Sequence, residues 1–565
     1  TASSSTYLRG DNTWATVAVG ISSDANKNIV GGTNAGDSFT NNDATDNLML
    51  GYDSGTATET GDHNIFLGSD SGKANVGGSN NVSIGSGSGA AMTGAENNVY
   101  LGYKAGRLST AENNVAIGGM ALYEAASGHN VAVGRAALSA GTGYQNTVIG
   151  SYACADAAGA KENDTYIGYK AGFATSTGVY NVGVGVLALE DNSTGGYNTA
   201  VGGDALKNNT TASHNVAVGT GALSTNTDGH TNTAIGRLAL EDADGANYNT
   251  AVGGYALGNA TSGFACTAVG VNALNVNTTG NYNEAFGYAA LRNATGGENV
   301  AVGSNAALNT GAGIRNVAVG SSALLTNSTG QYNTAIGYRS LYENNGDYNT
   351  TVGHNAAYYM DTGGGNVAVG HEAMRCASGT ATHPDNNVAI GNNAMKMATE
   401  ANECVVVGSG AAEDISTASE TTAIGRYALR NITTGVRNTA VGYNTMTDTQ
   451  DGEGNTCIGY EAGGTISSGD YNVCVGRLAG VNQITTGNDN LYIARSNGAA
   501  GTSGTWIHGS TSGLCIQGNN STSWSTTSDR RLKKNIVDST KGLAEIDQLR
   551  VTNFEYRKEE EIDMA

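Results

Sequence analysis

The chain is built from repeats such as "NTAVGGDAL" (198–206), "NVAVGTGAL" (215–223) and "NTAIGRLAL" (232–240). Each repeat starts with Asn, continues with three residues typical of a β-strand and reaches Gly after the Val or Ile. This glycine recurs from Gly51 to Gly476 at a step of about 17 residues, with slips of one. A fixed short period is the signature of a repeat protein whose units each pack on their neighbours.

A step this short cannot hold paired helices, and it suits one coil of a parallel β-solenoid. We expect each coil to hold a short strand, a glycine corner, a second short strand and a polar turn. Asn and Gly tolerate the left-handed backbone that corners need, and stacked coils should align the Asn side chains into a hydrogen-bonded ladder. With a degraded copy at "NLYIARSNG" (490–498), the sequence predicts an all-β parallel β-solenoid (β-roll) of about 27 coils.

The spacing of the repeats also predicts how the chain is divided into segments. Its one large irregularity is the longer step from Gly370 to Gly391, around the only proline, Pro384. An insert there must form an outward loop, because an interior one would break the stack. We expect four segments: an N-terminal lead-in (1–46), the solenoid shaft (47–498), connector strands (499–527) and a separate C-terminal segment (528–565).

Composition limits the partners of the chain. Gly makes up 84 of 565 residues while Pro occurs once, which indicates ordered glycine at positive φ and not a disordered chain. The net charge of −21 argues against nucleic acid, and no apolar run is long enough for membrane insertion. The seven cysteines show no metal or disulfide spacing, so we expect no metal and no cofactor. The chain lacks an initiator Met and a signal peptide, so we take it as a fragment or a processed product.

Each coil offers only about four apolar side chains, mostly Val, Ile, Ala and Leu. That is a thin core for one chain. Alanines at fixed register, such as Ala200 and Ala205, are small enough for backbones to approach closely. We therefore expect coils of several chains to pack face to face around a common axis with cyclic symmetry. Composition sets neither the number of chains nor the hand of the coil.

The motifs "NVAVG…AL" and "NTAIG…AL" resemble the head repeats of trimeric autotransporter adhesins, over about residues 47 to 498. The resemblance implies a left-handed parallel β-roll assembled as a homotrimer. Because the repeat of that family is shorter, the likeness concerns the motif and not the loop.

At Ser528 the composition changes, and four cations appear within five positions of "SDRRLKKNI". "GLAEIDQLRV" then predicts a short amphipathic helix and "TNFEYR" a strand. The pattern Ser-Asp-x-Arg-Leu-Lys before such a helix resembles the start of the endosialidase-type intramolecular chaperone of phage tail spikes and fibres. Residues 528–565 would then be the truncated beginning of an α+β chaperone domain.

In that family the domain helps to trimerise the shaft and then cuts itself off in front of the motif serine. The resemblance implies that Ser528 is the nucleophile, that Lys533 is its base and that the Thr527–Ser528 bond is cut. A serine hydroxyl needs a base, and a lysine kept neutral by burial can serve. Asp529 and Arg531 would hold this pair in place. The alternatives are an uncut, retained cap and a basic, solvated approach to a helix, so at most a single-turnover autoprotease is expected.

These features together predict the structural and adhesive shaft of a bacteriophage tail fibre, in the virion tail and outside the cell. Its partners would be two further copies, other tail proteins and a bacterial surface glycan or protein receptor. The alternative is a bacterial trimeric surface adhesin, which should end in a coiled coil and membrane strands. A depolymerase would need an inserted catalytic region, and an ice-binding solenoid a flat face of repeated Thr; the sequence favours neither.

Three weaker patterns have two interpretations each. Arg9-Gly10-Asp11 is predicted to form a strand and turn, with integrin binding as the alternative. Cys457 and Cys474 share one register and are predicted to be small buried residues in place of Ala, with a bond between them as the alternative. A tyrosine stripe precedes the register Asn, as a structural ladder or as a sugar-stacking surface; it comprises Tyr180, Tyr197, Tyr248, Tyr282, Tyr332, Tyr348 and Tyr471.

Overall fold

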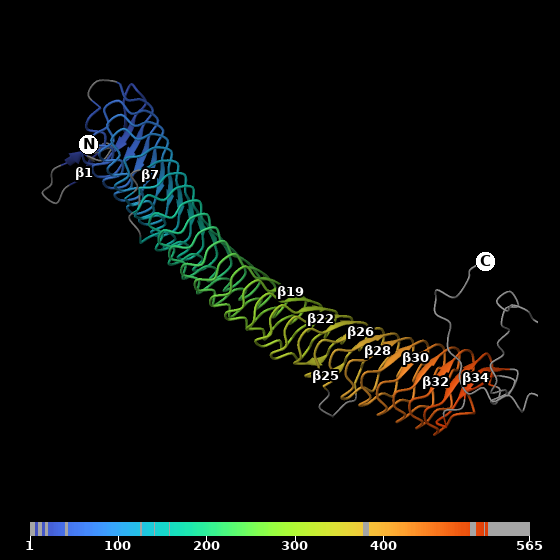
Figure 1. Cartoon of the computed structure of the whole chain (residues 1–565). Helices are drawn as coiled ribbons and strands as arrows, with labels where there is room; N and C mark the ends of the chain where they lie inside the picture. Colours follow the sequence, from blue (N-terminus) through green and yellow to red (C-terminus); the bar gives the residue numbers. More distant parts are fainter. Residues whose placement is uncertain are drawn as a thin grey trace, which may run out of the picture.

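The fold is a long, gently curved rod of stacked coils (Figure 1). The computed structural model describes residues 6–8, 14–16, 21–39, 43–124, 127–140, 142–156, 159–376, 383–497, 504–512 and 515–517. Across these residues the structure is all-β and contains no helix, so the predicted parallel β-solenoid is confirmed. The α+β segment predicted for 528–565 lies outside the described residues.

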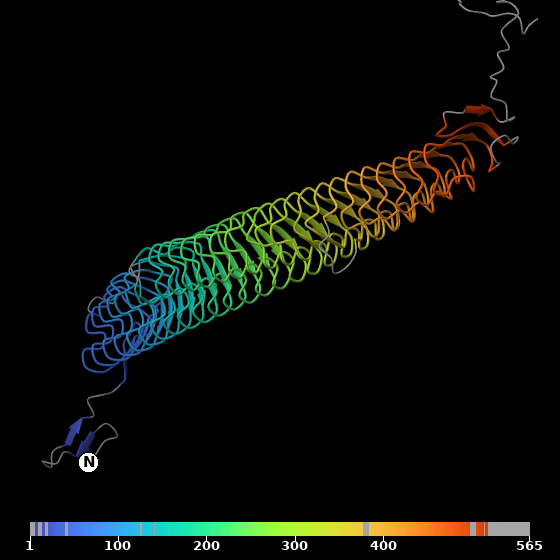
Figure 2. The ribbon, with the colours of Figure 1, turned by 60° about the horizontal axis from the view of Figure 1, so that its bottom comes forward.

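One continuous parallel sheet runs along the rod (Figure 2). Each coil contributes one strand, which pairs with the strands of the coils before and after it. Its strands are β4 (Ile29–Gly31), β5 (Leu48–Leu50), β6 (Ile65–Leu67), β7 (Val82–Ile84), β8 (Val99–Leu101), β9 (Val115–Ile117), β10 (Val131–Val133), β11 (Thr147–Ile149), β12 (Thr165–Ile167), β13 (Val182–Val184), β14 (Thr199–Val201), β15 (Val216–Val218), β16 (Thr233–Ile235), β17 (Thr250–Val252), β18 (Thr267–Val269), β19 (Glu284–Phe286), β20 (Val300–Val302), β21 (Val317–Val319), β22 (Thr334–Ile336), β24 (Thr350–Val352), β26 (Val367–Val369), β27 (Val388–Ile390), β28 (Val405–Val407), β29 (Thr422–Ile424), β30 (Thr439–Val441), β31 (Thr456–Ile458), β32 (Val473–Val475) and β33 (Leu491–Ala494).

Antiparallel strands lie at both ends of this sheet. β3 (Ser22–Ser23) pairs with β4 at the N-terminal end. β34 (Thr505–Gly509) pairs with β33, and β35 (Cys515–Gln517) pairs with β34 at the C-terminal end. A separate hairpin is formed by β1 (Thr6–Leu8) and β2 (Trp14–Thr16). The antiparallel strands β3, β34 and β35 pair with backbone groups at the two ends of the sheet. Unpaired groups there could bind a strand of another chain.

The parallel strands pair in strict register, so equivalent residues of successive coils stack. Ala200 pairs with Ala217, and Val201 pairs with Val218. The sheet begins at β4, one strand before the periodic glycines of the sequence. It also continues across the insert, because Val367 pairs with Val388. The insert therefore leaves the stack intact, as expected of an outward loop.

The prediction of a second short strand in each coil is wrong for most coils. Beyond the corner the φ angles of Asp204 and Leu206 are 57° and 49°, and a strand requires negative φ. Such a second pair is formed by β23 (Glu343–Asn344) and β25 (Tyr359–Asp361). Isolated parallel bridges, such as Asn309 with Thr326, lie in nearby coils. In most other coils this side is joined by separate backbone hydrogen bonds, such as Leu206 N–H to the Ala222 carbonyl (2.9 Å).

The predicted asparagine ladder is present along the whole rod. The N–H of Asn215 donates to Asn198 Oδ1 (3.0 Å), and Asn198 Nδ2 donates to the Ala212 carbonyl (2.8 Å). The ladder runs from Asn28 to Asn490, and its side chains are almost all buried. Each rung thus satisfies backbone groups that the thin core would otherwise leave unpaired. Four rungs hold another residue: Asp164, Cys266, Cys404 and Thr421.

Two interior positions of the coil vary together, so that a large side chain at one goes with a small one at the other. The commonest combination is a small residue in the middle of the strand and a leucine six positions later, as in Ala200 and Leu206, both fully buried. Where the strand residue is large, that later position is glycine: a Cβ on Gly72 would lie 2.6 Å from the Phe66 ring. The same exchange recurs for Met49 with Gly55, Tyr100 with Gly106 and Tyr166 with Gly172.

The two cysteines at one register behave as predicted. Cys457 and Cys474 are the middle residues of β31 and β32 and pair with each other in the sheet. Both are buried, free thiols at the position that holds Ala440 in the preceding coil.

The corner glycines provide a first prediction. Gly253 has φ of 134°, and a Cβ there would lie 2.5 Å from the Gly270 carbonyl oxygen. Replacing Gly253 by Ala should therefore destabilise its coil by at least about 2 kcal/mol through strain and overlap. Hydrogen exchange of the β17 and β18 amides would measure this change. Gly254→Ala is the matched control, because its nearest contact is at 3.8 Å; equal exchange in both variants would contradict the close-contact explanation.

The paired interior positions provide a second prediction. Phe66→Ala should cost about 3–5 kcal/mol by leaving a cavity, and Gly72→Leu about 1–3 kcal/mol by overpacking. The double variant recreates the Ala200–Leu206 pair and should recover most of both losses. A double-mutant cycle from thermal unfolding would give the coupling energy. Additive losses would show that the two positions do not share one space.

Candidate functional site

The residues predicted to carry chemistry fall outside the part of the chain that the structure describes. The nucleophile, base, supporting residues and cleaved bond lie outside the described residues, as does the Arg-Gly-Asp triplet. They stay predictions; they are Thr527, Ser528, Asp529, Arg531, Lys533, Arg9, Gly10 and Asp11.

A first candidate surface is the outer side of the parallel sheet, which we call the strand face. It consists of the first and third residues of each parallel strand, whose middle residue points inward. In β14 the middle residue, Ala200, is fully buried while Val201 is 37% exposed. Apolar third residues with similar exposure recur along the rod: Leu101, Ile117, Ile149, Ile167, Val201, Ile235, Phe286, Val302, Ile336, Val352, Ile390, Ile424 and Ile458.

The strand face corrects one expectation from the sequence. Ala200 and Ala205 were expected to let neighbouring chains approach, yet both are fully buried inside the coil of their own chain. The side chains available to a neighbour are instead the Val, Ile and Thr on either side of the inward alanine. The patterns "TAV" and "VAI" could have predicted this orientation. Successive strand residues point to opposite faces, so an inward alanine places the residues on either side of it on the outer face.

Exposed aromatic rings follow the rod beside the strand face. The rings of Tyr180, Tyr197 and His214 stack with centroids 5.1 Å apart, and Tyr332 stacks on Tyr348 at the same spacing. Tyr248 and Tyr282 join the same line through edge contacts with Phe264. Tyr471 instead donates its hydroxyl to Glu453 (3.0 Å).

These contacts confirm the structural ladder among the stacked tyrosines. A ring that stacks on rings in both neighbouring coils has both faces covered, so it offers mainly its edge to a sugar. A second line follows the corner, where Tyr338, His354 and His371 stack at 5.2 and 5.1 Å. The aromatic residues thus act first as contacts between coils.

Ion pairs also join successive coils. Arg315 Nε lies 2.9 Å from Glu298, Lys396 Nζ 2.7 Å from Glu372, and Arg430 Nε 3.0 Å from Glu413. The hydrogen bond from Arg315 holds the pKa of Glu298 below its usual value. Exposed pairs of this kind contribute little stability individually, but they occupy charges that could otherwise serve a ligand.

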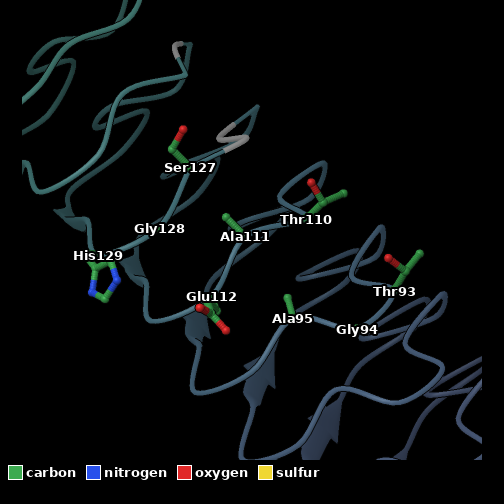
Figure 3. A pocket seen from close by; sticks show the side chains of 9 residues that line it. All are labelled: Thr93, Gly94, Ala95, Thr110, Ala111, Glu112, Ser127, Gly128 and His129. Atoms are coloured by element: carbon green, nitrogen blue, oxygen red, sulfur yellow. The ribbon is translucent and has the colours of Figure 1, made fainter.

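A shallow groove of about 440 Å³ crosses three coils near the N-terminal end (Figure 3). It lies where the corner glycines Gly102, Gly118 and Gly134 follow one another at a shorter step than in most of the rod, so each polar turn there has one residue fewer. Its lining is Thr93, Gly94, Ala95, Thr110, Ala111, Glu112, Ser127, Gly128 and His129. Glu112 is the one carboxylate in that lining, whereas glycoside hydrolysis usually needs two, so the groove does not support a depolymerase.

Two further kinds of site were sought along the described ranges. These residues hold no group of three or more His, Cys, Asp or Glu side chains placed to bind a metal ion. Among the same residues, no helix is long and apolar enough to cross a membrane.

Comparison with known proteins identifies the C-terminal segment. Residues 528–565 match the family described as the chaperone of endosialidase. The resemblance expected from "SDRRLKKNI" is therefore confirmed for this segment. No curated protein and no solved structure matches the chain, and the likeness of the shaft to adhesin heads stays a prediction.

Proposed function

We propose that this chain is the shaft of a trimeric bacteriophage tail fibre, located in the virion tail and exposed outside the cell. The observation that carries the proposal is the endosialidase-chaperone match at residues 528–565 at the end of a long β-solenoid. A permanent rod joined to a folding aid is the arrangement expected of a fibre. A bacterial surface adhesin would share the rod but not this segment, so the match favours the fibre.

The strand face supports a homotrimer. Parallel sheets are normally covered on both faces, yet this one leaves a row of Val and Ile side chains partly exposed along the rod. Exposed apolar surface of that extent marks an interface. Two further copies with the same repeat would present the same row at the same spacing, so three rods could bury their strand faces around one axis.

The chaperone segment would set the alignment of the three rods. Because successive coils are nearly alike, a shift of one coil between chains would look almost the same to the strand face. A trimeric clamp at one end removes that ambiguity. It would act during assembly and could then be released.

Release would use the residues predicted at the start of the segment. The Ser528 hydroxyl would attack the Thr527 carbonyl carbon while Lys533 accepts its proton. The peptide bond would be exchanged for an ester, which water then hydrolyses. The shaft would end at Thr527, and the released domain would begin at Ser528.

Adhesion is the role that a fibre shaft would serve. We propose a bacterial surface glycan or protein as receptor, and other tail proteins as attachment partners. In a trimer joined through the strand faces, the polar turns and the aromatic lines beside them would stay on the outside. These are the surfaces that a receptor could reach.

The cleavage step can be tested by the mass of the denatured product expressed from the full-length gene. We expect a wild-type chain that ends at Thr527 and an uncut Ser528→Ala chain. The matched control is Ser525→Ala, which should be cut like the wild type. Lys533→Ala should also stay uncut, whereas Lys534→Ala should not. Equal, uncut masses for all variants would remove the autoprotease and leave a retained cap.

The trimer can be tested on the strand face. Val201→Asp combined with Ile235→Asp places two charges in the proposed interface, and we expect light scattering to show a loss of trimer in favour of monomer. Circular dichroism should stay unchanged, because both side chains point away from the coil interior. Thr211→Asp, on an exposed polar turn, adds a charge elsewhere and should leave the trimer intact. A double variant that is still fully trimeric would show that the strand face is not the interface.

A further inference from the structure

One rung of the asparagine ladder holds an ionisable carboxyl group. Asp164 is 1% exposed and occupies the position that Asn146 and Asn181 hold in the neighbouring coils. Its N–H donates to Asn146 Oδ1 (3.0 Å), and its Oδ1 accepts from the N–H of Asn181 (2.7 Å). Asp164 Oδ1 therefore accepts the backbone N–H of the next rung residue, as the amide oxygen does at the ordinary rungs.

The other carboxyl oxygen takes the place of the amide nitrogen. At most ordinary rungs this nitrogen donates to a backbone carbonyl of the next coil: Asn181 to Gly195 (3.0 Å) and Asn198 to Ala212 (2.8 Å). For Asp164 the equivalent carbonyl is that of Gly178. Asp164 Oδ2 is buried and finds no donor. Since neither a carboxylate oxygen nor a carbonyl oxygen can donate, a hydrogen bond between Oδ2 and this carbonyl requires a proton on Oδ2.

Two other exceptional rungs keep a donor at this position. The thiol of Cys266 lies 3.2 Å from the Gly280 carbonyl oxygen, and that of Cys404 lies 3.4 Å from the Ala418 oxygen and 3.3 Å from the Asn402 oxygen. The Gly280 and Ala418 carbonyls have the same offset along the chain as at the ordinary rungs. At the fourth exception the Thr421 hydroxyl donates instead to the carbonyl of Ser419 (3.1 Å). At each of these three rungs, the S–H or O–H group of the side chain thus donates to a backbone carbonyl.

We propose that Asp164 is held in the folded rod as a neutral carboxylic acid whose Oδ2 hydroxyl donates to the Gly178 carbonyl, and that loss of this proton loosens the surrounding coils. The rung would then work as a pH-sensitive point in an otherwise neutral ladder. This inference concerns the shaft alone and is independent of the fibre proposal.

The surroundings of Asp164 support the neutral form. Desolvation by burial raises its pKa to about 7, although the backbone N–H and the side-chain amide of Asn181 and the positive charge of Lys161 act in the opposite direction. Lys161 donates from Nζ to the Ala140 carbonyl (2.9 Å). The other titratable groups that face the carboxyl are Cys154 and Tyr166, and burial raises the pKa of both, so they stay neutral.

The direction of the pH effect follows from linkage. The folded state holds the proton more tightly than the unfolded chain, whose Asp pKa is near 3.8. The stabilisation is therefore complete below that value and is lost as the pH rises to about 7. Within this window the local opening constant should rise about tenfold per pH unit, and it should level off above the folded pKa.

Hydrogen exchange of the full chain, read on peptides from 142–156 and 159–184, tests the proposal between pH 5 and 8.5. The comparison is with Asp164→Asn, which installs the ordinary rung residue and should fold. We expect the ratio of wild-type to variant opening to rise about 100-fold between pH 5 and 7 and then to become constant. A ratio that does not change over the whole range would overturn the proposal.

Two controls separate the rung from general charge effects. Asp156→Asn removes an exposed acid of the preceding coil and should keep the wild-type pH profile; if it abolished the profile, Asp164 would not be its source. Asn198→Asp places a carboxyl at an ordinary rung and should create the same dependence there. A protonated-carboxyl infrared band that is present in the wild type at pH 5 and absent in Asp164→Asn would support the proposal directly, and its absence from the wild type would count against it.

Discussion

The rod depends on the contact between the corner glycines of successive coils. At Gly253 the backbone has positive φ, and a Cβ would overlap the Gly270 carbonyl. Only glycine meets both conditions, so the corners let the coils approach to the spacing of paired strands, about 4.8 Å. Because that spacing recurs at the corners, equivalent positions of successive coils stack on one another. The strand pairs, the asparagine ladder and the aromatic lines all follow from this approach.

Stacking of equivalent residues gives each position along the coil its own environment. The inward middle residue of the strand must share a narrow space with the residue six positions later, so Ala200 goes with Leu206 and Phe66 with Gly72. Both members of such a pair are internal to one chain. The coil interior is therefore complete without a partner, and what remains for other chains is the outer side of the sheet.

The asparagine ladder supplies hydrogen-bond partners to the backbone polar groups inside a thin core. An asparagine offers one acceptor and one donor in the direction of the rod, and nearly all ordinary rungs use both; the buried side-chain nitrogen of Asn114 is an exception. A residue that replaces it must supply the same two functions or leave a buried group unpaired, which costs free energy. Asp164 supplies the acceptor in either protonation state but the donor only as the neutral acid. This is why a single carboxyl in this position couples the stability of the rod to pH.

The sequence by itself determined the fold class, the coil length, the asparagine ladder and the family of the C-terminal segment. These follow from local rules, since a short strand and a glycine corner that recur at one constant step leave little choice of architecture. Only the tertiary structure decided which side chains face inward. It placed Ala200 and Ala205 inside the coil, replaced the second strand by left-handed turns at Asp204 and Leu206, and paired Phe66 with Gly72. The roles of Ser528 and Lys533 rest on the sequence alone. Which side faces inward depends on how each coil closes and on the volume it encloses, and the period alone does not contain that information.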